Sequence, residues 1–246
     1  LGNLKYPARW VERALVPLSR IIVAISDHEY QQGLKAGIPA DRMRVIENGI
    51  SSRPPESVPA EWKDERTKVL FVGRLDRQKG VDVLLEAAAS LGETAVFRII
   101  GAHVTNRDHL KQATPANVEF LGWKSAEEIT GQMAVCDVVV MPSRWEGFGL
   151  VALEAMRAHK PVIASAVGGL QSVVSDGVTG ILFPAGDHAA LARAISSRNR
   201  ESWARMGAAG YQRFMERYRS ERTNQELMDL YRTIVSKPSA ESISRI

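Results

Sequence analysis

Cysteine and long apolar runs are both scarce in this sequence. Cys136 is the one cysteine among 246 residues, so no disulfide can form within the chain and we expect a reducing compartment. We interpret Cys136, which stands in an apolar context, as a small buried hydrophobic residue. The apolar stretch over residues 14–25 is broken by Pro17 and Arg20, is too short to span a bilayer and has no signal-peptide cleavage pattern.

Several sequence motifs are missing as well. There is no P-loop spacing and no G-x-G-x-x-G turn, which argues against a P-loop nucleotide site and makes an NAD-dependent oxidoreductase a weak alternative. No cluster of metal-ligating residues is visible, so we predict no metal site. A dense Lys/Arg stripe with interleaved aromatics is lacking, and we expect no nucleic-acid partner. The net charge of +4 is mildly basic and fits an anionic ligand or an anionic membrane surface.

What the chain does contain is typical of a globular α/β domain. Apolar residues make up 45% of it, enough for a sizeable core, and charged residues 24%, which argues against wholesale disorder. Short apolar runs alternate with amphipathic stretches after a Ser- and Pro-rich segment at 51–59, the best boundary in the chain. The runs are continuous rather than alternating, as in parallel strands covered on both faces. We therefore predict a Rossmann-like, doubly wound parallel sheet followed by C-terminal helices.

The individual elements can be placed from apolar periodicity, caps and turn residues. We expect strands at residues 21–25, 44–46, 69–72, 96–100, 118–121, 138–141, 162–164 and 180–183. We expect helices at residues 7–19, 28–36, 81–91, 126–134, 150–158, 170–175, 201–218 and 221–235. The predicted division is residues 1–50, a main domain over 51–235, and a loose tail over 236–246.

Two predicted strand-to-helix loops carry residues suited to an anionic ligand. The first, residues 73–80, opens with Gly73 and supplies Arg74 and Lys79, a guanidinium fork and a point charge. On these residues alone, a solvated basic loop is an equal alternative. The second, residues 142–149, holds Glu146 before a helix that carries Glu154, and its glycines lie where helix N–H groups favour oxygen-rich ligands. As an isolated pattern, Glu154 could be a plain acid on the surface of the helix. A third loop, residues 164–170, reads as an ordinary βα connection.

The ordered segments VGRLDRQKG, FLGW, DVVVMPSRWEGFGLVALEAM, PVIASAVGG and DGVTGILFPAGD resemble the C-terminal domain of family 4 retaining glycosyltransferases, which have the GT-B fold. The segment EGFGLVALE matches that family's E-x7-E motif, with Glu146 and Glu154 as its acids. The resemblance covers about residues 40–200.

The resemblance implies a role for each matching position. Arg74 and Lys79 match the pair that grips the diphosphate, Glu146 the acid at the transferred sugar, and Glu154 the acid at the ribose. We assign catalysis to Arg74, Lys79 and Glu146, with no metal or cofactor and with front-face attack through an oxocarbenium-like state. The full donor-binding set is Gly73, Arg74, Lys79, Leu121, Gly122, Glu146, Gly147, Phe148, Gly149, Leu150 and Glu154.

Three positions depart from the family pattern. Gln171 and Ser172 stand where Pro-Glu is usual, His159 replaces a glycine, and residues 101–104 replace a G-x-G-P turn. These changes bear on fine donor geometry rather than on class. We expect His159 and His103 to be surface or packing residues.

Residues 1–50 resemble the end of the acceptor-binding N-terminal domain of such enzymes, and the chain begins with Leu1, as a fragment or a processed chain would. The expected partners are a UDP- or GDP-linked sugar, a glycan or lipid-linked acceptor, and an N-terminal domain in the same or another chain. A cytoplasmic location is expected. The predicted helix region with Arg9, Trp10, Arg13 and Arg20 is interpreted as a domain-packing helix, with contact to the inner face of the membrane as the alternative. The alternative is a nucleotide-sugar-binding module, or donor subunit of a split enzyme, that transfers nothing alone.

Overall fold

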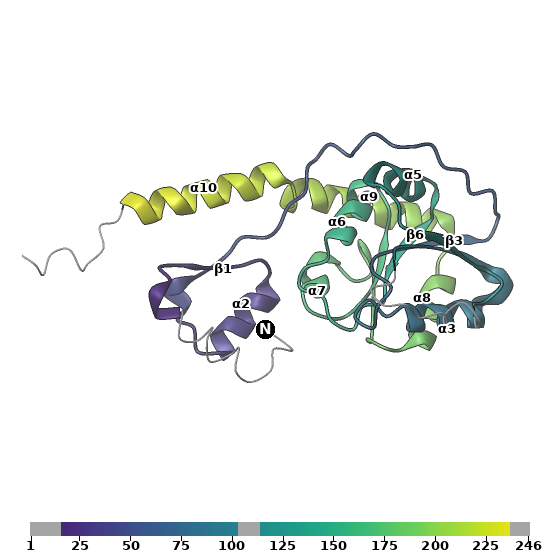
Figure 1. Cartoon of the computed structure of the whole chain (residues 1–246), viewed down its shortest axis with the longest axis horizontal. Coiled ribbons are helices and arrows are strands. Elements are labelled where there is room, and N and C mark those ends of the chain that lie inside the picture. The colour runs from purple at the N-terminus through teal and green to yellow at the C-terminus, as the bar shows by residue number, and fades with distance from the viewer. Residues whose placement is uncertain (1–15, 103–113, 237–246) are drawn as a thin grey trace, which may run out of the picture.

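The computed structural model describes residues 16–102 and 114–236, which form a smaller and a larger body (Figure 1). Most of the helix predicted at 7–19, the turn residues from His103, and the tail from residue 237 lie outside the described residues. Of the predicted first helix, the described part is a 3-10 turn, η1, at Val16–Leu18.

The smaller body is a two-stranded unit with one helix. Strand β1 (Ile22–Ala24) pairs in parallel with β2 (Met43–Val45), and α2 (Asp27–Lys35) and the turn η2 (Ala40–Arg42) connect them. The Ser26 hydroxyl accepts the Glu29 N–H at 3.2 Å and caps α2, as the sequence predicts. The two parallel strands and the helix between them form one crossover unit of a parallel sheet.

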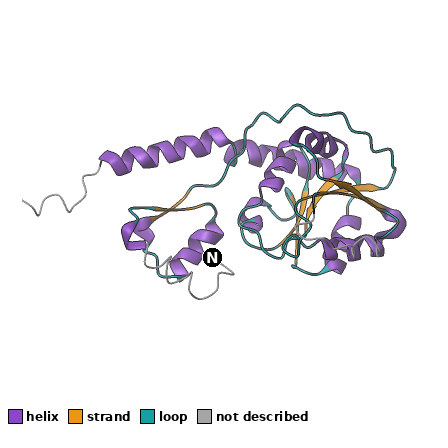
Figure 2. Cartoon of the chain, viewed as in Figure 1, coloured by secondary structure: helices purple, strands orange, loops and turns teal. Residues whose placement is uncertain are grey.

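The larger body is built on a six-stranded parallel sheet in the order β5-β4-β3-β6-β7-β8. Figure 2 shows its strands lying among the helices. Its strands are β3 (Thr67–Val72), β4 (Ala95–Ile100), β5 (Val118–Gly122), β6 (Val138–Met141), β7 (Val162–Ser165) and β8 (Gly180–Phe183). Its helices are α3 (Val81–Leu91), α5 (Ala126–Val135), α6 (Leu150–Arg157), α7 (Leu170–Val173), α8 (His188–Ser196), α9 (Arg200–Arg217) and α10 (Ser220–Ser236), with the turn η3 at Gly92–Thr94. The predicted Rossmann-like α/β fold is confirmed.

Successive residues of the central strands face opposite layers of the core. Val69 and Phe71 of β3 pack with α3, α8 and the start of α9, while Leu70 between them packs with α5, α6 and the end of α9. All three are essentially buried. Both faces of the sheet are therefore covered, which explains why its strands are continuous apolar runs.

The strand order reverses between β3 and β6. From β3 the chain winds outward through β4 to β5, and from β6 it winds the other way through β7 to β8. The loops after β3 and β6 thus leave the middle of the sheet side by side, where ligands bind in open α/β sheets.

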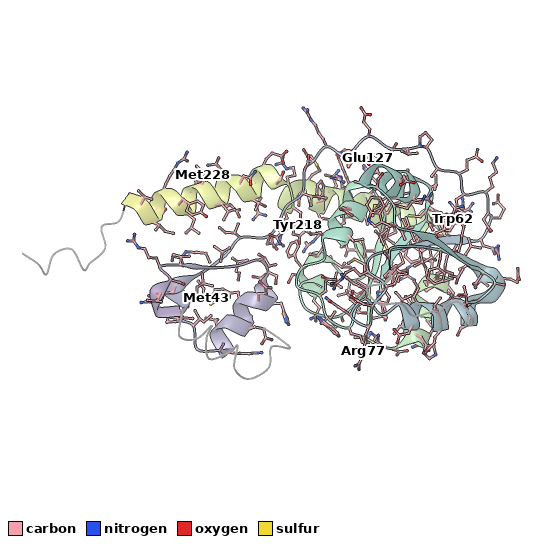
Figure 3. The ribbon with its side chains drawn as sticks, in the orientation of Figure 1. Met43, Trp62, Arg77, Glu127, Tyr218 and Met228 are labelled. Carbon is pink, nitrogen blue, oxygen red and sulfur yellow. The ribbon has the colours of Figure 1, made fainter. Side chains whose placement is uncertain are left out.

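The two bodies are joined at the turn between α9 and α10. The Ile50 N–H donates to the Tyr218 carbonyl at 3.0 Å, and the Ser220 N–H donates back to Ile50 at 2.9 Å. The buried carboxylate of Glu47 pairs with Arg217 at 2.9 Å. Figure 3 labels Tyr218 at this junction and Met228 on α10, which runs on above the smaller body. In the described part of the chain, no helix has both the length and the apolarity to cross a membrane.

Two packing predictions can be checked directly. Cys136 is buried, and burial raises the pKa of its thiol to about 12, as expected of a structural residue. His159 stacks on Tyr211 with ring centroids 3.8 Å apart, so its predicted packing role is confirmed. Its φ of 57° is in the left-handed region, which explains why a glycine suits that position.

Candidate functional site

The loops after β3 and β6 are tied together by a backbone and a side-chain hydrogen bond. The Arg144 N–H donates to the Gln78 carbonyl at 2.8 Å, and Gln78 Nε2 donates to the Trp145 carbonyl at 3.1 Å. At Gly80, whose φ is 67°, a Cβ would lie 2.0 Å from the Pro142 carbonyl oxygen. A side chain there would force the loops apart, so Gly80 fixes their approach.

This approach brings Lys79 and Glu146 into contact. Lys79 Nζ lies 2.5 Å from Glu146 Oε2, with side chains 18% and 12% exposed. The Ser143 hydroxyl donates to the same carboxylate oxygen at 3.4 Å. Positive and negative charge are thus held together at the switch point, with little water around them.

Arg74 lies on the same loop in a more open setting. Its side chain is 58% exposed and contacts Asp76 at 3.2 Å, and its Nη2 donates to Gln78 Oε1 at 2.7 Å. The guanidinium is therefore held at the exposed side of the loop after β3. Gln78, which binds it, also binds the loop after β6.

Helix α6 begins beside this pair without a side-chain cap. In the described residues, the N–H groups of Gly147, Phe148 and Gly149 have no hydrogen-bond acceptor. The Phe148 side chain is 3% exposed and meets Tyr218 edge-on at 6.0 Å, so only its backbone can reach a ligand. The exposed Leu150 follows at the first helical position. Free N–H groups at a helix start attract anions and oxygen-rich groups.

Glu154 is half-buried on the next turn of α6. Burial raises the pKa of its carboxyl, and the charge of Arg157 opposes the rise. Its carboxylate accepts no hydrogen bond from any described residue, whereas Arg157 Nη1 donates to the Ser51 carbonyl at 2.9 Å. A carboxylate without donors in a desolvated place is suited to binding hydroxyl groups.

The loops after β4 and β5 continue the same edge of the sheet. The Gly73 N–H donates to Ile100 at 3.0 Å, and the Gly101 N–H donates to Gly122 at 2.8 Å. Leu121 packs on the core while Gly122 ends β5. Because strands are spaced about 4.8 Å apart, Gly122 lies about 10 Å from Gly73. Leu121 and Gly122 thus lie at the same edge of the sheet as the loops that carry Lys79 and Glu146.

The loop after β7, residues 164–170, supports the loop after β6, residues 142–149. The Gly169 N–H donates to the Glu146 carbonyl at 3.2 Å, and a Cβ on Gly169 would lie 2.3 Å from the Gly147 carbonyl oxygen. The carbonyl of Ser172 instead binds Arg213 and Tyr218, at 2.7 and 3.2 Å. Sequence reasoning took this loop as an ordinary connection and missed its support of Glu146, although its paired glycines were a signal.

Sequence reasoning also missed Glu29, a residue of α2 whose carboxylate faces Gly147 across the two bodies. Its position in the chain indicates only a helix start.

Two surface hollows lie elsewhere, one near Lys68 and Arg200 and one between Arg20 and Leu230. The converging loops line neither hollow. Within the described ranges, no group of three or more His, Cys, Asp or Glu side chains could hold a metal ion.

The family to which the chain belongs follows from its central part. The profile described as "Glycosyl transferases group 1" matches residues 52–213, well over half of the sequence. The chain belongs to the group 1 glycosyl transferases. The predicted resemblance to a GT-B glycosyltransferase is thereby confirmed at the level of the group.

Curated relatives are similar to this chain in sequence over about 70% of its length. A protein of the cps region of Klebsiella pneumoniae is 38% identical over 70% of this chain and 50% of its own length. The alpha-D-kanosaminyltransferase of Streptomyces kanamyceticus is 31% identical over 72% of this chain and 50% of its own length. The chain thus spans about half the length of these curated relatives.

Solved structures agree in fold. A sucrose-phosphate synthase from Thermosynechococcus elongatus is 28% identical with a TM-score of 0.83, over 96% of this chain and 63% of that one. The Anabaena protein HepE, solved with UDP and glucose, is 25% identical with a TM-score of 0.79, over 96% of this chain and 70% of that one.

Proposed function

We propose that this chain is the donor-binding half of a family 4 retaining glycosyltransferase, which transfers a sugar from a nucleoside-diphosphate sugar to an acceptor. The observation that carries the proposal is the meeting of Lys79 and Glu146, at 2.5 Å, beside the free N–H groups at the start of α6. A cation, an acid and a helix N-terminus at one switch point suit a sugar joined to a diphosphate. That HepE was solved with UDP and with UDP-glucose supports the same ligand class.

Each group has a part in the proposed reaction. Arg74 and Lys79 stabilise the negative charge that grows on the leaving diphosphate, which lowers the barrier to leaving-group departure. The N–H groups of residues 147–149 bind the same region, and Glu146 holds the transferred sugar. Glu154 accepts hydrogen bonds from the ribose, and the backbone at Leu121 and Gly122 lies by the base. These cations replace a metal ion, and no cofactor is required.

Retention in this proposal comes from attack on the same face that the diphosphate leaves. The bond from the sugar to the diphosphate breaks as the acceptor oxygen approaches, through an oxocarbenium-like state. The departing diphosphate oxygen takes the proton of the acceptor hydroxyl. No protein group becomes covalently attached, and Glu146 is not a nucleophile.

The acceptor side belongs to residues 1–50 and to an N-terminal domain in this or another chain. We propose residues 51–235 as the donor domain. UDP and GDP are the candidate nucleotides, and a polysaccharide, an envelope glycan or a lipid-linked glycan is the candidate acceptor. The cps-region relative is consistent with polysaccharide synthesis. A cytoplasmic location, at the inner face of the membrane if residues 7–20 bind it, completes the proposal.

A thermal-shift screen of sugar nucleotides tests this function. The proposal predicts that a UDP- or GDP-linked sugar raises the melting temperature and that NAD does not. Lys79→Ala should abolish the shift. Lys63→Ala, which breaks an exposed 3.0 Å pair with Glu61 away from the candidate site, is the matched control and should keep it. Tight binding with neither donor hydrolysis nor transfer would favour the alternative, a binding module.

A further inference from the structure

The smaller body reaches the candidate site through Glu29. Helix α2 packs beside α7, next to the loop that starts α6 (Figure 1). Glu29 Oε2 accepts the Ile25 N–H at 3.2 Å and so helps to close the start of α2. Glu29 Oε1 accepts no hydrogen bond from a described residue and lies 3.9 Å from where a Cβ on Gly147 would be.

Gly147 is a glycine that the described fold does not require. A Cβ on Gly80 or Gly169 would lie 2.0 or 2.3 Å from a carbonyl oxygen, so packing explains both. A Cβ on Gly147 would have one described atom within 4 Å, which is Glu29 Oε1, and Gly147 is not among the residues with positive φ. An alanine would therefore fit. What the glycine preserves is open space in front of a carboxylate oxygen.

The position of this space indicates what it holds. It adjoins Glu146 and the free N–H groups that follow it, where the proposed function places the transferred sugar. A carboxylate oxygen without a donor is a strong acceptor for a hydroxyl group. We propose that a hydroxyl of the transferred sugar lies against Gly147 and donates to Glu29 Oε1, so that the smaller body contributes a specificity residue to the donor site. This inference rests on the proposed function.

The test compares a sugar nucleotide with its free nucleoside diphosphate by isothermal titration calorimetry. UDP-glucose, UDP-N-acetylglucosamine and GDP-mannose are tried with the whole chain, and the tightest is kept with its matching UDP or GDP. Glu29→Gln keeps an oxygen for the Ile25 N–H and turns an NH₂ toward the sugar. It should lower the affinity for the sugar nucleotide about tenfold or more and leave the affinity for the diphosphate unchanged. Gly147→Ala should lower the affinity for the sugar nucleotide more than the affinity for the diphosphate, because its methyl group fills the space.

Ser26→Ala is the structural control. It removes the 3.2 Å cap of α2 without entering the space, so it should lower the melting temperature and keep the ratio of the two affinities. Equal affinities for the sugar nucleotide in wild type, Glu29→Gln and Gly147→Ala would overturn the inference. So would an equal loss for UDP or GDP, since Glu29 would then only support the loop. Wild type that binds no nucleotide at all would instead refute the proposed function, and the inference with it.

Discussion

We predict that the Glu154 carboxylate lowers the stability of the folded protein and raises its affinity for the nucleotide. Burial raises the pKa of its carboxyl above the ordinary 4.5. Between the unfolded and the folded pKa, the folded protein binds more protons, so stability falls as pH rises through that window and the cost is complete above it. Glu154→Gln carries no such charge. Its melting temperature should exceed that of wild type at pH 7, and the gain should vanish below about pH 4.5.

The same substitution should damage ligand binding. If the carboxylate accepts ribose hydroxyls, losing its charge costs about 1.5–3 kcal/mol, or roughly 10- to 150-fold in Kd. Scanning calorimetry against pH measures the first effect, and titration with UDP or GDP the second. Glu216→Gln, at an exposed position of α9 without a described hydrogen bond, is the control and should change neither. A variant that gains stability but keeps its nucleotide affinity would show that Glu154 is not at the ribose.

Three further predictions concern the scaffold. Gly80→Ala should destabilise by about 2 kcal/mol or more in urea unfolding, because its Cβ meets a carbonyl oxygen at 2.0 Å; Gly177→Ala, with φ 72° but open space, should cost only about 1 kcal/mol. A similar loss of stability in the two variants would mean that the loops after β3 and β6 can move apart to accept a side chain at Gly80. Glu47→Gln should cost about 3 kcal/mol because two arginines lose a buried partner, whereas Glu226→Gln, in a partly exposed pair, should cost less than about 1 kcal/mol. Cys136 should resist thiol reagents at pH 8 until the protein unfolds, because its pKa is about 12. Fast labelling of folded protein would contradict that burial.

The elements of the fold could be predicted closely because their signals are local. The helix at 81–91 and the strands at 138–141 and 180–183 have the predicted bounds, since glycine, proline and apolar runs mark their ends. Strands β3 and β4 begin earlier than predicted, at Thr67 and Ala95, where pairing continues beyond the apolar run. Helix α7 is shorter than predicted and ends at Val173.

The residues of the candidate site could be predicted from the sequence, but the contacts between them could not. Arg74, Lys79, Glu146 and Glu154 follow from motifs, but the direct pairing of Lys79 with Glu146 depends on β3 lying next to β6, strands whose paired residues are 69 positions apart in the sequence. Sequence order does not say which strands are neighbours. The approach of Glu29 to Gly147 depends in addition on how the smaller body is held by the α9–α10 turn. No local pattern encodes such a contact.

The central claim is that one nucleoside-diphosphate sugar lies across the loops after β3 and β6. A crystal structure of the chain soaked with UDP or GDP tests it most directly. We predict that the diphosphate contacts Arg74, Lys79 and the N–H groups of residues 147–149, with the ribose at Glu154. A diphosphate bound instead near Lys68 and Arg200, at the opposite end of β3, would contradict the account.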